Sequence, residues 1–150
     1  DEQFNKILTN NIVANHWLIS MVVPEMTARG EGSVTIISSI GGIKASTVIG
    51  AYCISKAADM QLARNLSAEY GPQGVRVNCI APGLIKTDFA KALWDDPETL
   101  KRSTAGACLK RIGEPEEIAG AAVFLASRAG AFTTGQTIVI DGGATINGGA

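Results

Sequence analysis

Apolar side chains recur every three or four residues along the first part of the chain, and this spacing predicts a helix. The stripe begins at Phe4 and ends at Val22, and Pro24 and Gly30 mark the point at which such a helix frays. We therefore expect one long helix over about residues 2–28. Its stripe is formed by Phe4, Ile7, Leu8, Asn11, Ile12, Asn15, Leu18, Ile19 and Val22.

Three short apolar runs predict buried strands. They span residues 33–39, 75–80 and 137–140, and they are rich in β-branched side chains and bounded by turn residues. Strands that are apolar on both faces are typical of parallel sheets covered by helices on both sides. The sequence therefore predicts an α/β fold, with about three parallel strands and flanking helices as in part of a doubly wound sheet.

The remaining segments predict two further helices and one loop region. A second long helix is expected over residues 51–70, ending at Gly71, and a third from Glu114 to about Ser127. Periodicity is weak over residues 84–110, which is typical both of loops that close over a substrate and of ordinary surface excursions. The packing face of the second helix is predicted to consist of Ala57, Ala58, Leu62, Ala63 and Leu66.

Composition and charge narrow the classes of function. With 150 residues and 46% hydrophobic content the chain can form one domain, and its net charge of −1 gives no electrostatic basis for binding nucleic acid or an acidic membrane surface. Three cysteines without Cys-x-x-Cys spacing and a lone His16 predict no metal site. Cys53 suits a redox-sensitive thiol, although a buried, inert cysteine is the commoner case.

No stretch of the sequence is long and apolar enough to span a bilayer, so no membrane partner is expected. Neither a secretory signal nor a Ser-Lys-Leu ending is recognisable within the 150 residues. The expected location is the cytoplasm.

Tyr52 and Lys56 are the most informative pair in the chain. On a helix over residues 51–70, a spacing of four places both side chains on one face, one turn apart. A cation close to a tyrosine hydroxyl favours the phenolate form, and a phenol tuned in this way can give or take a proton. Taken alone, such a pair also occurs on solvated helix faces.

Ser39 strengthens the indication, because it ends the first predicted strand just before the Gly41-Gly42 turn. In open parallel sheets, ligands bind beyond the carboxyl ends of the strands, which is where Ser39 is expected to lie. The layout of strand end, turn and helix therefore predicts an active site. Ser39 also suits a simple turn serine, and Ser38 beside it suits that role equally well.

With these residues in place, the chain resembles the short-chain dehydrogenase/reductase family in its single-domain form. Asn11, Ser39, Tyr52 and Lys56 stand where that family keeps its catalytic tetrad. The resemblance continues in three downstream segments, residues 76–87, 113–119 and 135–143. It covers nearly the whole chain.

The resemblance implies reversible hydride transfer between a nicotinamide and a carbonyl or secondary alcohol carbon. Tyr52 is implied to pass the proton to or from the substrate oxygen, and Ser39 to donate a hydrogen bond to the same oxygen. Lys56 is implied to support Tyr52 and to reach the nicotinamide ribose hydroxyls. The Asn11 carbonyl is implied to hold a water behind the lysine, although an isolated Asn11 also suits a structural amide.

Further cofactor contacts are implied for the segment after the second predicted strand. They involve Pro82, Gly83, Ile85 and Thr87, in addition to the tyrosine and the lysine. Ile85 and Thr87 are implied to meet the nicotinamide carboxamide. Pro82-Gly83 also suits a plain loop start, and Thr87 also suits a helix N-cap. The two roles of Thr87 are compatible.

The family's opening Thr-Gly-x-x-x-Gly-x-Gly turn and its Asn-Ala-Gly stretch are not found in this sequence. We therefore expect residues 1–150 to be the C-terminal portion of one Rossmann-type domain in a longer enzyme. The implied cofactor is NAD or NADP. The choice rests on an acidic or basic residue after the family's second strand, so this chain does not decide it.

The expected partners are a small carbonyl or alcohol substrate and further copies of the chain. The resemblance implies a homodimer or homotetramer in which helices 2–28 and 51–70 pack against their twins. The alternative is a helix-mediated oligomerisation or interaction module without catalysis, in which small side chains allow close approach, namely Ala51, Ala57, Ala58 and Ala63. A serine hydrolase is excluded for want of Gly-x-Ser-x-Gly and a suitably placed histidine.

Overall fold

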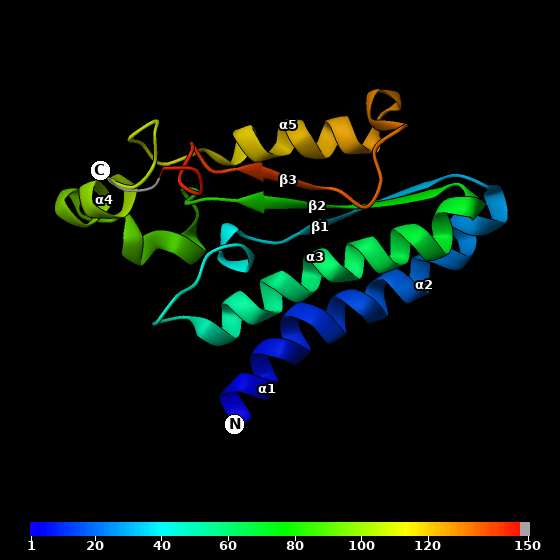
Figure 1. Cartoon of the computed structure of the whole chain (residues 1–150), viewed down its shortest axis with the longest axis horizontal. Coiled ribbons are helices and arrows are strands. Elements are labelled where there is room, and N and C mark those ends of the chain that lie inside the picture. Colours follow the sequence, from blue (N-terminus) through cyan, green and yellow to red (C-terminus); the bar gives the residue numbers. More distant parts are fainter. Residues whose placement is uncertain (148–150) are drawn as a thin grey trace.

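The computed structural model describes residues 1–147, and Figure 1 shows their arrangement. The helices are α1 (Glu2–Leu8), α2 (Ala14–Arg29), α3 (Gly50–Tyr70), α4 (Pro97–Thr104) and α5 (Pro115–Ala126). The strands are β1 (Gly32–Ile37), β2 (Val75–Pro82) and β3 (Thr137–Ile140). Short 3-10 turns lie at Ile40–Gly42, Gly71–Gln73, Asp88–Leu93 and Arg128–Gly130.

The strands form a parallel sheet in the order β1-β2-β3, which confirms the predicted α/β class. α2 and α3 cover one face of this sheet and α5 covers the other (Figure 1). β1 ends at Ile37, two residues earlier than predicted, so Ser39 lies in the turn beyond the strand. The other edge of β1 has no partner strand among residues 1–147.

The core is centred on β2, which contributes buried residues to both faces of the sheet. Four alternate residues join one apolar cluster with α2 and α3, namely Val75, Val77, Cys79 and Ala81. On the opposite face of β2, Ile80 is fully buried on the side covered by α5, where Leu125 is also fully buried. This burial on both faces explains why the strand is mostly apolar, with Arg76 and Asn78 as its polar residues.

Helical structure is continuous from α1 to α2, as predicted, but the two helices are joined by a π-helical turn, Thr9–Val13. α2 ends at Gly30, which adopts the left-handed conformation (φ 71°) that glycine tolerates at a helix C-cap. The extra residue of a π turn rotates everything after it about the helix axis. The faces of α1 and α2 are therefore not in register with a single unbroken stripe.

The predicted packing faces of the two long helices are partly wrong. In the first, Phe4, Leu18 and Val22 are exposed, Ile19 is buried as predicted, and Val23, which lay outside the predicted stripe, is buried as well. On the second helix, Ala57 is exposed rather than packed. The buried residues of α3 are Ser55, Asp59, Met60, Ala63 and Leu66.

Residues 84–110, where the apolar periodicity is weak, contain two short helical segments, Asp88–Leu93 and α4. Thr87 caps the 3-10 turn that follows it, and Asp96 caps α4 by accepting from two backbone amides. α5 begins with a capping box between Glu114 and Glu117. Within residues 1–147, no helix is both long and apolar enough to cross a bilayer.

Candidate active site

The carboxyl end of β1 carries two serines with different surroundings. Ser38 is buried, and its hydroxyl donates to the Lys56 carbonyl at 2.7 Å, so it ties the strand end to α3. Ser39 is half-buried and begins the 3-10 turn, where its Oγ accepts from the Gly41 amide at 3.0 Å. An accepting hydroxyl still has its proton to donate. Ser39 is therefore the serine whose hydroxyl can serve a substrate oxygen.

The two glycines of this turn bring it directly onto α3. A methyl group on Gly42 would lie 2.7 Å from the Ala57 amide nitrogen, closer than atoms can approach, so only glycine fits there. A methyl group on Gly41 would lie 3.4 Å from both Ser39 Oγ and Tyr52 Cε1. The serine hydroxyl and the tyrosine ring therefore border the same turn.

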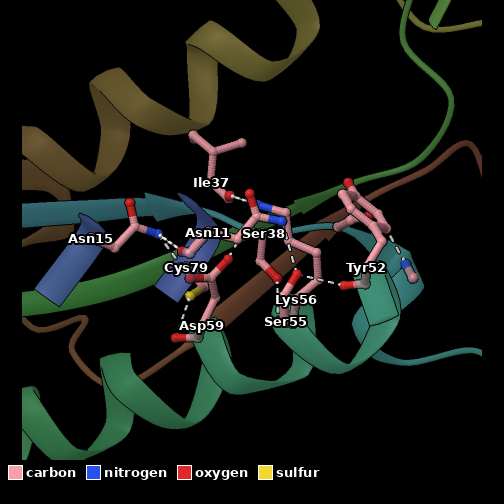
Figure 2. Close-up of polar contacts among 11 residues, drawn as sticks. Asn11, Asn15, Ile37, Ser38, Tyr52, Ser55, Lys56, Asp59 and Cys79 are labelled. Atoms are coloured by element: carbon pink, nitrogen blue, oxygen red, sulfur yellow. Dashed lines mark hydrogen bonds and ion pairs between the residues drawn. The ribbon is translucent and has the colours of Figure 1, made fainter. Parts of the chain in front are cut away.

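Tyr52 and Lys56 lie one turn apart on α3 and face the same side (Figure 2). The Lys56 Nζ is 5.8 Å from the centroid of the Tyr52 ring. Both residues are half-buried. The structure thus brings together the phenol, the ammonium and the Ser39 hydroxyl that the sequence predicted as one constellation.

The Lys56 ammonium is fixed by two acceptors. It donates to the Ile37 carbonyl, at the end of β1, at 2.9 Å. It also lies 3.2 Å from Oδ2 of Asp59, and the lysine side chain is only 13% exposed. An ammonium has three protons, so one proton remains for a further acceptor.

Asp59 is the buried partner of this ammonium, with a side chain that is 0% exposed. Its Oδ1 accepts from the side-chain amide of Asn15 at 2.9 Å. Burial raises the pKa of the Asp59 carboxyl above its ordinary value, and the Lys56 charge and the Asn15 hydrogen bond partly counter that rise. The carboxyl group is thus held between α2 and the lysine.

Asn11 lies in the π turn, and π turns are frequent at functional sites. Its side-chain amide donates to Ser55 Oγ at 2.9 Å, and that hydroxyl donates to the Tyr52 carbonyl at 2.7 Å. The Asn11 carbonyl accepts from the Asn15 side chain at 2.7 Å. The water contact implied for this carbonyl stays a prediction.

Pro82 is the last residue of the central strand and Gly83 follows it, at the same end of the sheet as Ser39. The Gly83 amide donates to the Ile140 carbonyl at 2.8 Å, and a methyl group on Gly83 would lie 2.7 Å from Asp141 Cα. Close approach to the exit of β3 therefore requires glycine. This is a structural reason for the Pro-Gly pair, and it leaves the predicted cofactor contact as a prediction.

Ile85 and Thr87 occupy the loop beyond this point. Ile85 pairs with Gly113 through an isolated β-bridge and lines a cavity of about 250 Å³. Thr87 is exposed, and its Oγ1 accepts from the Ala90 amide at 3.4 Å. The N-cap role of Thr87 is confirmed, and its hydroxyl proton remains available to a ligand.

A shallow depression of about 360 Å³ lies beside the lysine, along the edge of β1. Its walls include Lys56, Asn11 and Asn15, together with residues 34–37 of β1. Lys56 and Asn11 are therefore reachable from this edge of the sheet, whereas Ser39 and Tyr52 do not line the depression. None of the predicted tetrad is buried in the apolar core.

Asp59 and Asn15 were not predicted as site residues from the sequence. Each carried a readable signal, because each is a polar residue within an apolar helix face. Asp59 follows Lys56 by three positions, and Asn15 follows Asn11 by four, so each shares a helix face with a predicted site residue. Which helix would meet which depended on the packing of α2 against α3.

Comparison with known proteins gives consistent results. A family model described as enoyl-(acyl carrier protein) reductase matches residues 1–145. The bovine (Bos taurus) protein named dehydrogenase/reductase SDR family member 4 is 45% identical over 143 residues, which are 95% of this chain and 51% of that protein. A tropinone reductase homolog of Arabidopsis thaliana is 39% identical over 147 residues, covering 98% of this chain and 55% of that protein. The chain thus spans about half the length of the curated relatives it matches.

Solved structures agree with this relationship. A gluconate 5-dehydrogenase from Burkholderia cenocepacia, in complex with NADP and tartrate, superimposes with a TM-score of 0.93 at 31% identity, over 97% of this chain and 57% of that chain. A 4-hydroxyisoleucine dehydrogenase complexed with NADH gives the same TM-score and identity, over 97% and 60% of the two chains. The chain belongs to the short-chain dehydrogenase/reductase family.

Proposed function

We propose that this protein is an NAD(P)-dependent oxidoreductase that interconverts a carbonyl compound and a secondary alcohol. The observation that carries the proposal is the position of Tyr52 and Lys56, one turn apart on α3, beside the turn that begins with Ser39. The names of the relatives, dehydrogenases and reductases, and the NADP and NADH in two similar structures support it.

In the proposed reaction, a bound nicotinamide supplies a hydride to the carbonyl carbon, or accepts it in the reverse direction. In the direction of reduction, Tyr52 gives its hydroxyl proton to the substrate oxygen, so that an alcohol forms. Ser39 donates a hydrogen bond to that oxygen and stabilises the charge that develops there. Lys56 favours the deprotonated tyrosine, and Asn11 organises the water behind the lysine.

The residues present fit the ribose end of a nicotinamide nucleotide. Lys56 has one ammonium proton left after its two contacts, which suits a ribose hydroxyl. Four residues near the ends of the central and last strands are the further candidates for cofactor contacts, namely Pro82, Gly83, Ile85 and Thr87. The cofactor is NAD or NADP, and no residue named here favours one of them.

The membership of a larger domain and the association of copies of the chain are also proposals. We infer that residues 1–150 form the C-terminal portion of a Rossmann-type domain in a cytoplasmic homodimer or homotetramer. Exposed apolar side chains on the two long helices support contact between copies, namely Trp17 and Met21 on α2 and Ile54 on α3. Ala63 takes no part in that contact, because it is buried in the core.

Isotope transfer tests the proposed reaction. Full-length protein is incubated with NADPH or NADH deuterated at C4, in separate samples for the two faces, and with a panel of ketones and aldehydes. We expect deuterium to appear on the carbinol carbon of the product for one face only, measured by mass spectrometry. Product formation without deuterium transfer from either face, or no cofactor oxidation with any member of the panel, would contradict the proposal.

A further inference from the structure

Asp59 is a fully buried carboxyl group on the face of α3 that packs into the core, next to Met60. A carboxyl group in such a position costs free energy unless it is paired, and an aliphatic side chain would avoid that cost. Both of its side-chain oxygens point to the candidate site rather than to a surface ion pair (Figure 2). The fold alone gives no reason for an acidic residue here.

The contacts of Asp59 form one connected path through three elements. Oδ2 lies 3.2 Å from the Lys56 ammonium, and Oδ1 accepts from Asn15 Nδ2 at 2.9 Å. The same Asn15 amide donates to the Asn11 carbonyl at 2.7 Å. An Asn15 side chain with both amide protons engaged is fixed in orientation, and it fixes the carboxylate in turn.

We propose that Asp59, oriented by Asn15, is a positioning residue that pairs with the Lys56 ammonium and so offsets part of the positive charge that Tyr52 experiences, while the Ile37 carbonyl keeps that ammonium against β1. This inference rests on the proposed function, because it concerns how the tyrosine and the lysine work. It adds a residue outside the predicted tetrad. Asp59 touches neither substrate nor cofactor and acts through Lys56.

The charge argument fixes the sign of the effect. A cation near a phenol favours the phenolate, and a carboxylate that pairs with that cation weakens its influence. When the carboxylate is removed, the Ile37 carbonyl still anchors the ammonium at 2.9 Å, and the ammonium then acts on Tyr52 without compensation. The pH midpoint of catalysis should therefore be lower in the variant.

The groups around Asp59 allow this effect to be isolated. The ionisable groups in contact with it are Lys56, on the same helix, and Cys79 of β2, whose thiol lies 3.4 Å from the Asp59 carbonyl oxygen. α2 contributes the neutral Asn15 amide, and β1 contributes the neutral Ile37 carbonyl bonded to Lys56. Cys79 is fully buried, and burial raises the pKa of its thiol to about 12, so it stays neutral across the assay range.

The test is the pH profile of kcat/KM for NAD(P)⁺-dependent oxidation of a secondary alcohol by full-length Asp59→Asn protein. We expect the midpoint of the profile to move to lower pH by at least about half a unit. The matched control is Glu25→Gln, which removes the acidic partner of an exposed helical ion pair with Arg29 and should leave the midpoint unchanged. A midpoint that stays in place or moves to higher pH in Asp59→Asn would overturn the proposal.

Two further variants keep the outcome decisive. If Asp59→Asn does not fold, Asn15→Ala is used instead, because it removes the hydrogen bond that stabilises the ionised Asp59 carboxylate. The midpoint of the pH profile of Asn15→Ala should then move to lower pH by a smaller amount than expected for Asp59→Asn. An unchanged midpoint would overturn the proposal. Tyr52→Phe separates the two claims. An active Tyr52→Phe protein would overturn the proposed function and this inference together, whereas an inactive one with an unmoved Asp59→Asn midpoint would overturn this inference alone.

Discussion

At the scale of single residues, the site depends on which polar groups are tied to the fold and which are free. Ser38 and Ser55 donate their hydroxyl protons to backbone carbonyls of α3, so both serve structure. Ser39 and Lys56 each keep one donor after their internal contacts are counted within residues 1–147. The free hydroxyl proton of Ser39, just beyond the end of β1, can be donated to a substrate oxygen.

The cysteines give a residue-scale prediction. Cys79 is fully buried, and burial raises the pKa of its thiol to about 12, so almost no thiolate forms in mildly alkaline buffer. Cys108 is exposed. We expect iodoacetamide to alkylate Cys108 within minutes while Cys79 stays unmodified until the protein is denatured, as read by peptide mass spectrometry. Rapid alkylation of Cys79 in the native protein would contradict the described packing.

Some of these residue roles could be predicted from sequence and others could not. The spacing of Tyr52 and Lys56 was sufficient to place them on one face, because helical geometry alone determines it. The contacts of Asp59 with Asn15 depend on how two helices pack, and no local spacing encodes that. The choice between Ser38 and Ser39 likewise needed the position of α3.

At the scale of elements, the turn at Ile40–Gly42 determines how the strand end meets the helix. Its Gly42 lies against the α3 backbone so closely that a Cβ would stand 2.7 Å from the Lys56 carbonyl carbon. The distance between Ser39 and the Tyr52–Lys56 pair is therefore set by a glycine contact. The sequence predicted a turn here, but glycine was expected only as a turn former.

Substitution Gly42→Ala tests this contact. The added methyl must displace either the turn or the helix, so we expect the free energy of unfolding to fall by about 1–3 kcal/mol and turnover to fall as well. The matched control is Gly120→Ala in α5, where a methyl group meets nothing within 4 Å and a gain of about 0.5–1 kcal/mol is expected. Urea unfolding of both variants measures the difference. A Gly42→Ala protein as stable as wild type would refute the close approach.

The positions of helices and strands were predicted correctly where the apolar pattern was strong. The buried face of the first long helix was predicted wrongly where the π turn changes the pitch. The strands over 75–80 and 137–140 appear as β2 and β3, because short runs rich in β-branched residues are distinctive. One unbroken apolar stripe was expected along the first helix, but the π turn rotates α2 relative to α1, and Val22 is exposed. A single extra residue in a turn leaves no signal in a pattern of apolar spacing.

At the scale of the whole molecule, the proposal that residues 1–150 are part of a larger Rossmann-type domain rests on one edge of the sheet. The outer edge of β1 is unpaired within residues 1–147, and the depression beside Lys56 opens along it. Unpaired parallel edges with apolar surroundings are normally covered. The family's glycine-rich turn, which holds the cofactor pyrophosphate, is not found in the sequence.

This absence leads to a prediction about cofactor binding by the 150-residue chain alone. The cofactor contacts proposed for this chain all lie at the nicotinamide end of the cofactor. Without a pyrophosphate site, we therefore expect the isolated chain to bind neither NADPH nor NADH tightly. Isothermal titration calorimetry provides the measurement, with full-length protein as the control. Micromolar binding by the isolated chain would contradict the expectation.

Sedimentation separates the enzyme from the alternative of an interaction module. Both predict association through α2 and α3, where Trp17 and Met21 are exposed. Only the enzyme predicts that full-length protein also binds and turns over cofactor. A dimer whose sedimentation and absorbance show no response to NADPH or NADH would favour the module.

The central claim, that Tyr52 is the proton donor and acceptor of the reaction, has a direct test in kcat. The full-length Tyr52→Phe protein should retain cofactor affinity while its turnover falls by at least ~100-fold, the usual effect of losing a general acid. Tyr70→Phe, which removes the hydroxyl at the far end of the same helix, should keep the wild-type kcat. Turnover by Tyr52→Phe equal to that of Tyr70→Phe would contradict the account.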